Sequence, residues 1–343
     1  MTKQVLVTGA TGFIAMQTIL DLLEGDYRVR GTVRSLNKAD TLREALRPHT
    51  PMADMLELVE ADLSSDKGWD QAVEGCDAVL HLASPFPAAQ PKNPDELIKP
   101  ARDGALRVLR AAKAAGVKRV VMTSSMAAIA YGWGDSRPDL LTEAHWSNPD
   151  NLKDNTAYTR SKTIAERAAW DFVNSPEGEG LELATINPAA VLGPALCAEV
   201  STSLEIVSRL IAVKMPALPN VSFGIIDVRD VSQAHIQAME TPEAAGQRFI
   251  LTDRTLWFTD IADTLRTAFP DRAEKIPTRK IPNWVLKLMA VFDPALKQIV
   301  PELGRFRNAS NTQLKTVLGI TPRPAEEAII ASATSLLEHK VVS

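Results

Sequence analysis

Short, mostly apolar runs alternate with longer segments of helical spacing through the first half of the chain. The runs are rich in β-branched residues and fall at 5–7, 29–33, 56–59, 78–82, 120–123 and 183–186. Runs of this kind are expected for strands that are covered on both faces of a parallel sheet.

Longer segments between these runs have the spacing of helices, at 12–23, 95–115 and 157–173. In the middle segment, one helical face collects Leu97, Ile98, Leu106, Leu109 and Ala112. Alternation of strands and helices predicts right-handed βαβ units. We therefore expect an α/β fold with a doubly wound, mostly parallel Rossmann sheet.

The pattern changes after about residue 187, where prolines at 188, 194, 216 and 219 interrupt it. We expect loops around one helix at 204–213, a strand at 248–251 that returns to the sheet, and mostly helices and loops over 257–343. The predicted division is a dinucleotide-binding domain of 1–187, rejoined by about 225–252, and a smaller, partly discontinuous substrate lobe of 188–224 and 253–343.

The first predicted strand runs directly into a glycine turn, TGATGFIA at 8–15. Glycines such as Gly9 and Gly12 let the backbone approach a pyrophosphate, and the following helix points its first N–H groups at the anion. Ala15 stands where a small residue lets helix and strand pack closely. A turn that merely joins strand to helix is the alternative, but the position between a buried strand and an amphipathic helix favours a nucleotide site.

Cations follow the second predicted strand, where a cofactor without a 2′-phosphate usually meets a carboxylate. Arg34 ends this strand and Lys38 comes about one helical turn later. A guanidinium offers a fork of donors to a phosphate and an ammonium adds a point charge, although two solvated loop cations are also common. We expect NADPH as the cofactor, with Asp62 and Leu63 flanking its adenine.

A YxxxK pair, Tyr158 and Lys162, lies at the start of the predicted helix 157–173. Residues four apart share a helix face, so both side chains can reach one cleft. Reducing a carbonyl requires a proton donor, and a tyrosine has a pKa near ~10. A nearby cation lowers such a pKa by ~1–3 units. We therefore expect Lys162 to lower the pKa of Tyr158 and to hydrogen-bond the nicotinamide ribose.

Hydroxyl side chains end the fifth predicted strand at Thr123, Ser124 and Ser125. In open α/β sheets, ligands bind beyond the carboxyl ends of the strands, so these hydroxyls are placed to meet cofactor and carbonyl oxygen. The alternative is that they only terminate the strand.

Composition excludes several other classes. The net charge is −4 and no long basic run occurs, so no nucleic-acid surface is expected. Cys76 and Cys197 are too few and too distant for a disulfide framework or zinc site, which favours a reducing cytoplasm. No apolar stretch approaches the ~18 residues of a membrane span. The sequence contains no HExxH or CxxC motif, so no metal site is expected. It contains no GxSxG or GxxxxGK motif, which argues against a hydrolase or a P-loop kinase.

Seven segments of the sequence together resemble a known protein family, although no single one of them would be specific. They are TGATGFIA (8–15), VRSLNKA (33–39), HLASPF (81–86), KRVVMTSSMAA (118–128), AYTRSK (157–162), INPAAVLGP (186–194) and IDVRDVSQAH (226–235). In this order they resemble the extended short-chain dehydrogenases/reductases. The similarity is greatest to the dihydroflavonol reductase and cinnamoyl-CoA reductase branch, with its yeast-type methylglyoxal/isovaleraldehyde carbonyl reductases. The residues after about 253 carry little resemblance.

The resemblance implies that Ser125, not Ser124, is the catalytic serine. Tyr158 is then the acid, and Lys162 tunes it and holds the ribose. For the cofactor, the resemblance implies that Thr11, Gly12, Phe13 and Ile14 contact the pyrophosphate and that Arg34 and Lys38 bind the 2′-phosphate. Ala83 and Ser84 then lie along the cofactor, and Pro188 to Val191 cover the nicotinamide. Ser203 is expected to contact a cofactor phosphate.

The expected function is NADPH-dependent reduction of a moderately hydrophobic aldehyde or ketone to the alcohol, by a monomer or homodimer. The alternatives are a sugar-nucleotide epimerase, a hydroxysteroid dehydrogenase, or a non-enzymatic NADP-sensing regulator on the same fold. Arg34 and the stretch HLASPF favour the reductase, and a regulator is not expected to keep Ser125, Tyr158 and Lys162 together. Candidates for an apolar substrate pocket are Phe86, Met126, Tyr131, Trp133 and Phe223.

Overall fold

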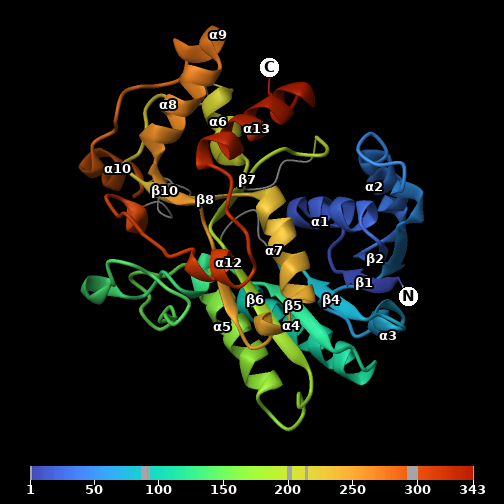
Figure 1. The fold of residues 1–343 in the computed structure, drawn as a ribbon. Helices are drawn as coiled ribbons and strands as arrows, with labels where there is room; N and C mark the ends of the chain where they lie inside the picture. The colour runs from blue at the N-terminus through green and yellow to red at the C-terminus, as the bar shows by residue number, and fades with distance from the viewer. Residues whose placement is uncertain are drawn as a thin grey trace.

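A seven-stranded sheet runs through the centre of the computed structural model, which describes residues 2–85, 91, 93–198, 203–212, 215–291 and 300–342 (Figure 1). Its strands, in spatial order, are β3 (Glu57–Glu60), β2 (Tyr27–Val33), β1 (Lys3–Val7), β4 (Ala78–His81), β5 (Arg119–Thr123), β6 (Glu182–Pro188) and β9 (Arg248–Leu251). All pairings in this sheet are parallel. The predicted doubly wound α/β fold is confirmed.

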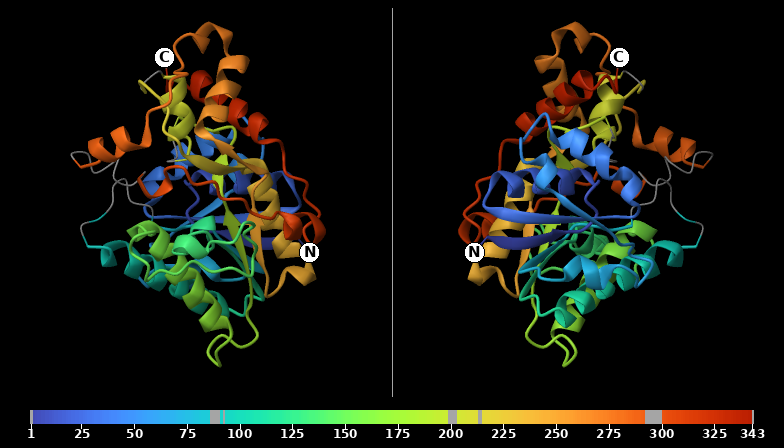
Figure 2. Two further views of the ribbon diagram at one scale, coloured as in Figure 1. Left: turned by 90° about the vertical axis from the view of Figure 1, so that its left-hand side faces the viewer. Right: turned by 90° about the vertical axis from the view of Figure 1, so that its right-hand side faces the viewer.

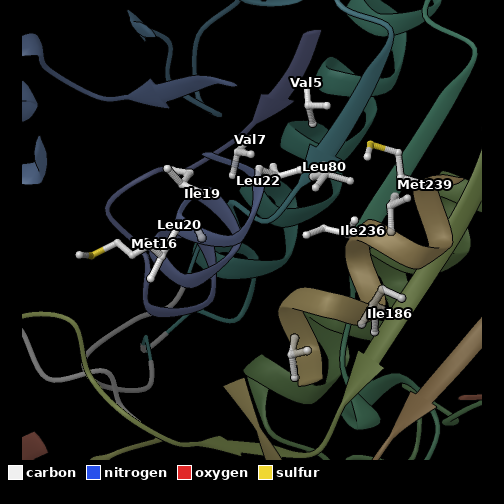
Figure 3. Close-up of a cluster of buried hydrophobic side chains, with 14 of the residues drawn as sticks. Val5, Val7, Met16, Ile19, Leu20, Leu22, Leu80, Ile186, Ile236 and Met239 are labelled. Carbon is white, nitrogen blue, oxygen red and sulfur yellow. The ribbon is translucent and has the colours of Figure 1, made fainter. Parts of the chain in front are cut away.

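Neighbouring residues of each strand enter opposite cores. On β1, Val5 and Val7 belong to one buried cluster, whereas Leu6 belongs to another. The first cluster lies under α1 (Phe13–Glu24) and α7 (Val228–Glu240), as Figure 3 shows with Leu22 of α1 beside Leu80 and with Ile236 and Met239 on α7. The second lies under α3 (Trp69–Val73), α4 (Asp95–Ala114) and α5 (Ala157–Val173). Because both faces are covered, the central strands β1, β4 and β5 read as nearly continuous apolar runs.

A second sheet lies beside the first and was not predicted. Its strands are β10 (Arg254–Trp257), β8 (Ser222–Asp227) and β7 (Ala190–Leu192), in that order. With α6 (Glu205–Ile211), α8 (Phe258–Ala268) and α13 (Ala325–Glu338) it encloses a core of its own. The expectation of loops around a single helix after residue 187 was therefore incomplete, because three- to six-residue strands lack a clear period.

The elements of the C-terminal half divide between the two sheets. β9 joins the edge of the main sheet as expected, whereas β8 pairs only with β7 and β10 among the described strands. α6 confirms the predicted helix at 204–213, of which residue 213 lies outside the described residues. The division into two domains at the predicted boundaries stays a prediction.

Short helices complete the described chain. They are η1 (Leu36–Lys38), α2 (Ala39–Leu46), η2 (Ala53–Met55), η3 (Met126–Ala128), η4 (Gly134–Ser136), η5 (Pro242–Ala244), α9 (Pro270–Ala273), α10 (Asn283–Met289), η6 (Val300–Glu302) and α12 (Thr312–Thr316). Figure 2 shows α8 and α9, in orange, at the end of the molecule opposite α4 and α5, in cyan and green. Across the described ranges, no helix is both long and apolar enough to cross a membrane.

Candidate active site

The turn after β1 requires its glycines. Gly9 has φ +69°, and a Cβ on it would lie 3.0 Å from Cβ of Ala83. The Gly9 N–H donates to Oγ1 of Thr32 on β2 at 3.0 Å, and the Ala83 N–H donates to Oγ1 of Thr8 at 2.9 Å. Gly12 is the N-cap of α1, and it has no side chain that could accept from the first-turn N–H groups. The turn is thus held between β2 and β4 with the helix N-terminus open to an anion.

A cavity of about 420 Å³ opens beside this turn. It is lined by the turn and the first residues of α1, the ends of β5 and β6, the start of α5 and the segment that follows β7. The predicted site residues that line it are Gly9, Thr11, Gly12, Phe13, Ile14, Ser84, Thr123, Ser125, Tyr158, Lys162, Pro188, Val191 and Ser203. The structure therefore brings together residues from widely separated parts of the sequence.

The other predicted cofactor residues do not line this cavity. Arg34 and Lys38 are exposed beyond the end of β2. Asp62 follows β3, and two hydrogen bonds from Ser64 and then the charge of Arg34 lower the pKa of its carboxyl group. Leu63 is half-buried and packs against α4. A Cβ placed on Gly104 of this helix would lie 2.9 Å from Cβ of Leu63. These residues lie beyond the ends of β2, which pairs with β1, and of β3, the edge strand on the other side of β2.

Ser125, Tyr158 and Lys162 meet at the ends of β5 and α5. A capping box starts α5, in which the Thr159 N–H donates to Oγ1 of Thr156 at 3.2 Å and the Thr156 N–H donates to Oγ1 of Thr159 at 2.9 Å. The Ser125 side chain caps η3 by accepting from the Ala127 N–H at 3.1 Å, and it hydrogen-bonds Tyr158. Nζ of Lys162 lies 5.9 Å from the centre of the Tyr158 ring.

Burial governs the protonation of this group. It raises the pKa of Tyr158, and the hydrogen bond from Ser125 only partly opposes the rise. Burial also lowers the pKa of Lys162 to about 8, against the charge of Glu166. The expected lowering of the Tyr158 pKa by Lys162 is therefore wrong in net direction, because desolvation of the phenolate outweighs other effects. Tyr158 holds its proton at neutral pH.

The two serines have different partners, although both line the cavity. Ser124 is buried and its hydroxyl donates to the carboxylate of Glu166. Ser125 instead bonds Tyr158. Thr123 is held from α7, where Nε2 of His235 lies 2.6 Å from its Oγ1. Burial lowers the pKa of His235 to about 4, so this contact is neutral at physiological pH.

Sequence analysis missed part of the lining. The additional residues are Ala15, Met16, Leu82, Ala195, Leu196 and Cys197. Apart from Cys197 they carry little chemistry of their own. The position of Met16 on the first turns of α1 was an available signal, whereas 195–197 reach the cavity only through the path of the chain after β7.

The predicted apolar pocket residues lie elsewhere. Met126, Tyr131 and Trp133 pack against a small buried cluster around Ile129. Phe223 packs in the second core, with its ring 6.1 Å from that of Phe258. Phe86 lies outside the described residues. None of the described four lines the cavity beside the glycine turn.

Comparison with known proteins identifies the family. The model of the NAD dependent epimerase/dehydratase family matches residues 5–251. A cinnamoyl-CoA reductase of Medicago truncatula is 38% identical over 78% of this chain and 81% of its own. A ketoreductase of Aspergillus niger, azaE, is 31% identical over 99% of each chain.

Solved structures agree with these relatives. Yeast methylglyoxal/isovaleraldehyde reductase Gre2, complexed with NADPH, has a TM-score of 0.80 at 29% identity over 98% of each chain. Vestitone reductase from alfalfa (Medicago sativa) has a TM-score of 0.76 at 25% identity over 99% of each chain. The predicted resemblance and the choice of NADPH are confirmed. The chain belongs to the NAD-dependent epimerase/dehydratase family of extended short-chain dehydrogenases/reductases, and it is an NADP-dependent oxidoreductase of the carbonyl reductase type.

Proposed function

We propose that this enzyme reduces a moderately hydrophobic aldehyde or ketone to the alcohol, with Ser125, Tyr158 and Lys162 as its catalytic residues. One observation carries the proposal: these three side chains line the same cavity as the glycine turn. A carbonyl in that cavity would lie between a proton donor and a cofactor site, which is the arrangement that reduction requires.

The residues present fit NADPH. The open N-terminus of α1 suits a pyrophosphate, for which Thr11, Gly12, Phe13 and Ile14 are the proposed contacts. Arg34 and Lys38 are proposed for the 2′-phosphate and Asp62 and Leu63 for the adenine side. Gly9, Ala83, Ser84, Thr123, Pro188, Val191 and Ser203 are proposed to line the rest of the cofactor. When bound, NADPH supplies the hydride.

The chain's own residues supply the proton. Tyr158 keeps its phenolic proton at neutral pH because burial raises its pKa, so it is in the correct state to donate to the forming alkoxide. Ser125 is a second hydroxyl at the same point and orients the carbonyl oxygen. Lys162, charged below its pKa of about 8, stabilises negative charge developing on this oxygen and holds the ribose.

The lining supports an apolar substrate. Leu82, Val191, Ala195 and Leu196 contribute aliphatic surface, whereas the polar groups gather around Tyr158 and the glycine turn. Such a cavity favours carbonyl compounds whose remaining surface is hydrophobic.

A panel of carbonyl compounds tests this function. Aliphatic and aromatic aldehydes, ketones, a steroid ketone and a nucleotide sugar are each incubated with NADPH, and its oxidation is followed by absorbance. We expect net oxidation with aldehydes or ketones of moderate hydrophobicity. Epimerisation of the nucleotide sugar without net oxidation would instead favour the epimerase, and turnover restricted to the steroid would favour the hydroxysteroid dehydrogenase. Tight NADPH binding without turnover of any compound would favour the regulator.

We infer a monomer or homodimer acting in the reducing cytoplasm. The support for the compartment is chemical: Cys76 and Cys197 are both unpaired thiols, as is usual for proteins of a reducing compartment. Light scattering coupled to gel filtration measures the oligomeric state, and a trimer or larger assembly would contradict it.

A further inference from the structure

Glu166 is a buried charge on the helix that carries Tyr158 and Lys162. It comes four residues after Lys162 on α5, so the three side chains follow one another along one helix face. Its side chain is 0% exposed. A carboxylate in the protein interior is costly unless it is paired and hydrogen-bonded, so its partners indicate what it does there.

The Glu166 carboxylate joins α5 to three strands of the main sheet. Oε2 accepts from the hydroxyl of Ser124, at the end of β5, and from Nδ2 of Asn187 on β6 at 2.7 Å. Oε1 accepts from Nε of Arg248 on β9 at 2.7 Å. Two weaker donors are Oγ1 of Thr185 at 3.1 Å and Nε1 of Trp170 at 3.4 Å.

The same network fixes the backbone around Ser125. Nδ2 of Asn187 donates to the carbonyl of Ser125 at 3.2 Å as well as to Glu166. The Ser124 N–H donates to the carbonyl of Ile186 at 2.7 Å. Together with the hydrogen bond from the Ser124 hydroxyl to Glu166, these contacts fix the backbone of Ser124 and Ser125. The Ser125 hydroxyl is thereby left directed toward Tyr158.

Glu166 also acts on Lys162. Among the described residues, the charged or titratable groups that act on this ammonium besides Tyr158 are Glu166 and His81. Burial keeps His81 neutral with a pKa of about 3. Burial drives the pKa of Lys162 down to about 8, while the charge of Glu166 raises it. Without that charge, Lys162 would lose its proton at a lower pH.

Arg248, on β9, forms an ion pair with Glu166. Its guanidinium lies 3.7 Å from the centre of the Trp146 ring and donates to the carbonyls of Glu143 and His145 at 2.6 and 2.7 Å. Burial raises the pKa of the nearby Glu143 carboxyl, which accepts from the Ile250 N–H at 3.2 Å. Arg248 is therefore fixed independently of the cavity.

We propose that Glu166 is the positioning residue of the Ser125–Tyr158–Lys162 site. It holds the end of β5 that presents Ser125, and it stands one helical turn after Lys162 on α5. The kinetic part of this inference rests on the proposed function. The effect of Glu166 on NADPH binding can be measured without knowing the substrate. A residue with only a structural role would support folding without changing how Lys162 titrates.

The pH dependence of Glu166→Gln tests the proposal. NADPH dissociation constants and kcat/KM are measured across the pH range around the pKa of Lys162. In the wild type, the NADPH dissociation constant should rise and kcat/KM should fall as pH rises through about 8, where Lys162 loses its charge. We call this change the alkaline loss. In Glu166→Gln this alkaline loss should move down by about one pH unit. Glu166→Asp keeps the charge and should leave the loss near its wild-type position.

Thr185→Val is the matched control. It removes a neutral donor from the same carboxylate and keeps the shape of the side chain, so it should lower Tm without moving the alkaline loss. If Glu166→Gln leaves Arg248 unpaired and fails to fold, the double variant Glu166→Gln/Arg248→Gln removes both charges and should show a smaller shift in the same direction, because Glu166 comes closer along α5 to Lys162 than Arg248 on β9 does.

An unchanged alkaline loss in folded Glu166→Gln or in the double variant would overturn the proposal and leave Glu166 a structural residue. The two proposals fail separately. A wild type that binds NADPH with the expected pH dependence but reduces no carbonyl contradicts the proposed function alone.

Discussion

The two ends of the proposed cofactor site differ in their exposure to water. At the proposed catalytic end, Lys162 is 8% exposed and Glu166 is fully buried. At the proposed 2′-phosphate end, Arg34 and Lys38 are exposed. Electrostatic interactions are strong in a buried, low-dielectric site and are screened at the surface. Substitutions at the buried end should therefore have large effects on chemistry, and those at the exposed end smaller effects on cofactor choice that depend on salt.

The largest effect is expected for Tyr158→Phe. The ring keeps its place in the cavity, so the NADPH dissociation constant should change little. Loss of the proton donor should lower kcat/KM by about 100- to 10,000-fold, the usual contribution of general acid catalysis. Steady-state kinetics with a substrate from the carbonyl panel measures this. Near-normal turnover would exclude Tyr158 as the acid.

The next effect separates the two serines. Ser125→Ala should lower kcat by about 100-fold or more, as removal of an oriented donor to an oxyanion does. Ser124→Ala should affect kcat much less, but it removes a hydrogen bond to buried Glu166 and should lower the free energy of unfolding by about 1.5–3 kcal/mol. Kinetics and denaturant unfolding of both variants measure these effects. The reverse kinetic order would show that the catalytic serine is Ser124.

At the exposed end, Arg34→Ala should weaken NADPH binding by about ten- to a hundredfold and leave NADH binding nearly unchanged. The reason is the loss of about 1.5–3 kcal/mol from charge-assisted hydrogen bonds to the 2′-phosphate. Dissociation constants of both cofactors at fixed ionic strength test this. Equal weakening of NADH and NADPH would place Arg34 on the adenine, and a wild type that binds both equally would contradict the phosphate site.

The smallest effect is expected for Lys38→Ala, which should weaken NADPH binding by less than about fivefold in the same direction. A surface ammonium is screened by salt and is worth ~1 kcal/mol or less. Titration of NADPH at low and high ionic strength should show the difference from wild type shrinking with salt. A loss larger than that in Arg34→Ala would make Lys38 the main phosphate ligand.

Much of the main sheet could be predicted because its signals are local. β1 and β4 to β6 are mostly apolar runs, and the glycine turn follows the first of them. α7 was missed although its signals are present: the Asp227 side chain accepts from the Arg229 N–H at 2.8 Å as an N-cap, and Val228, Val231 and Ala234 recur on one face. The small sheet left weaker signals, since β7 spans only Ala190–Leu192 and β8 pairs with it across a long stretch of chain.

The sequence by itself determined the order of strands and helices, the glycine turn and the placement of Tyr158 and Lys162 on one helix face, because backbone conformation and i, i+4 spacing are local properties. Only the tertiary structure decided what surrounds these residues. The contact between Ser125 and Tyr158, the partners of Glu166 and the part of the cavity formed by 195–203 join distant segments. Burial, which raises the pKa of Tyr158 and lowers that of Lys162, is the sum of such contacts and has no signature in the local sequence.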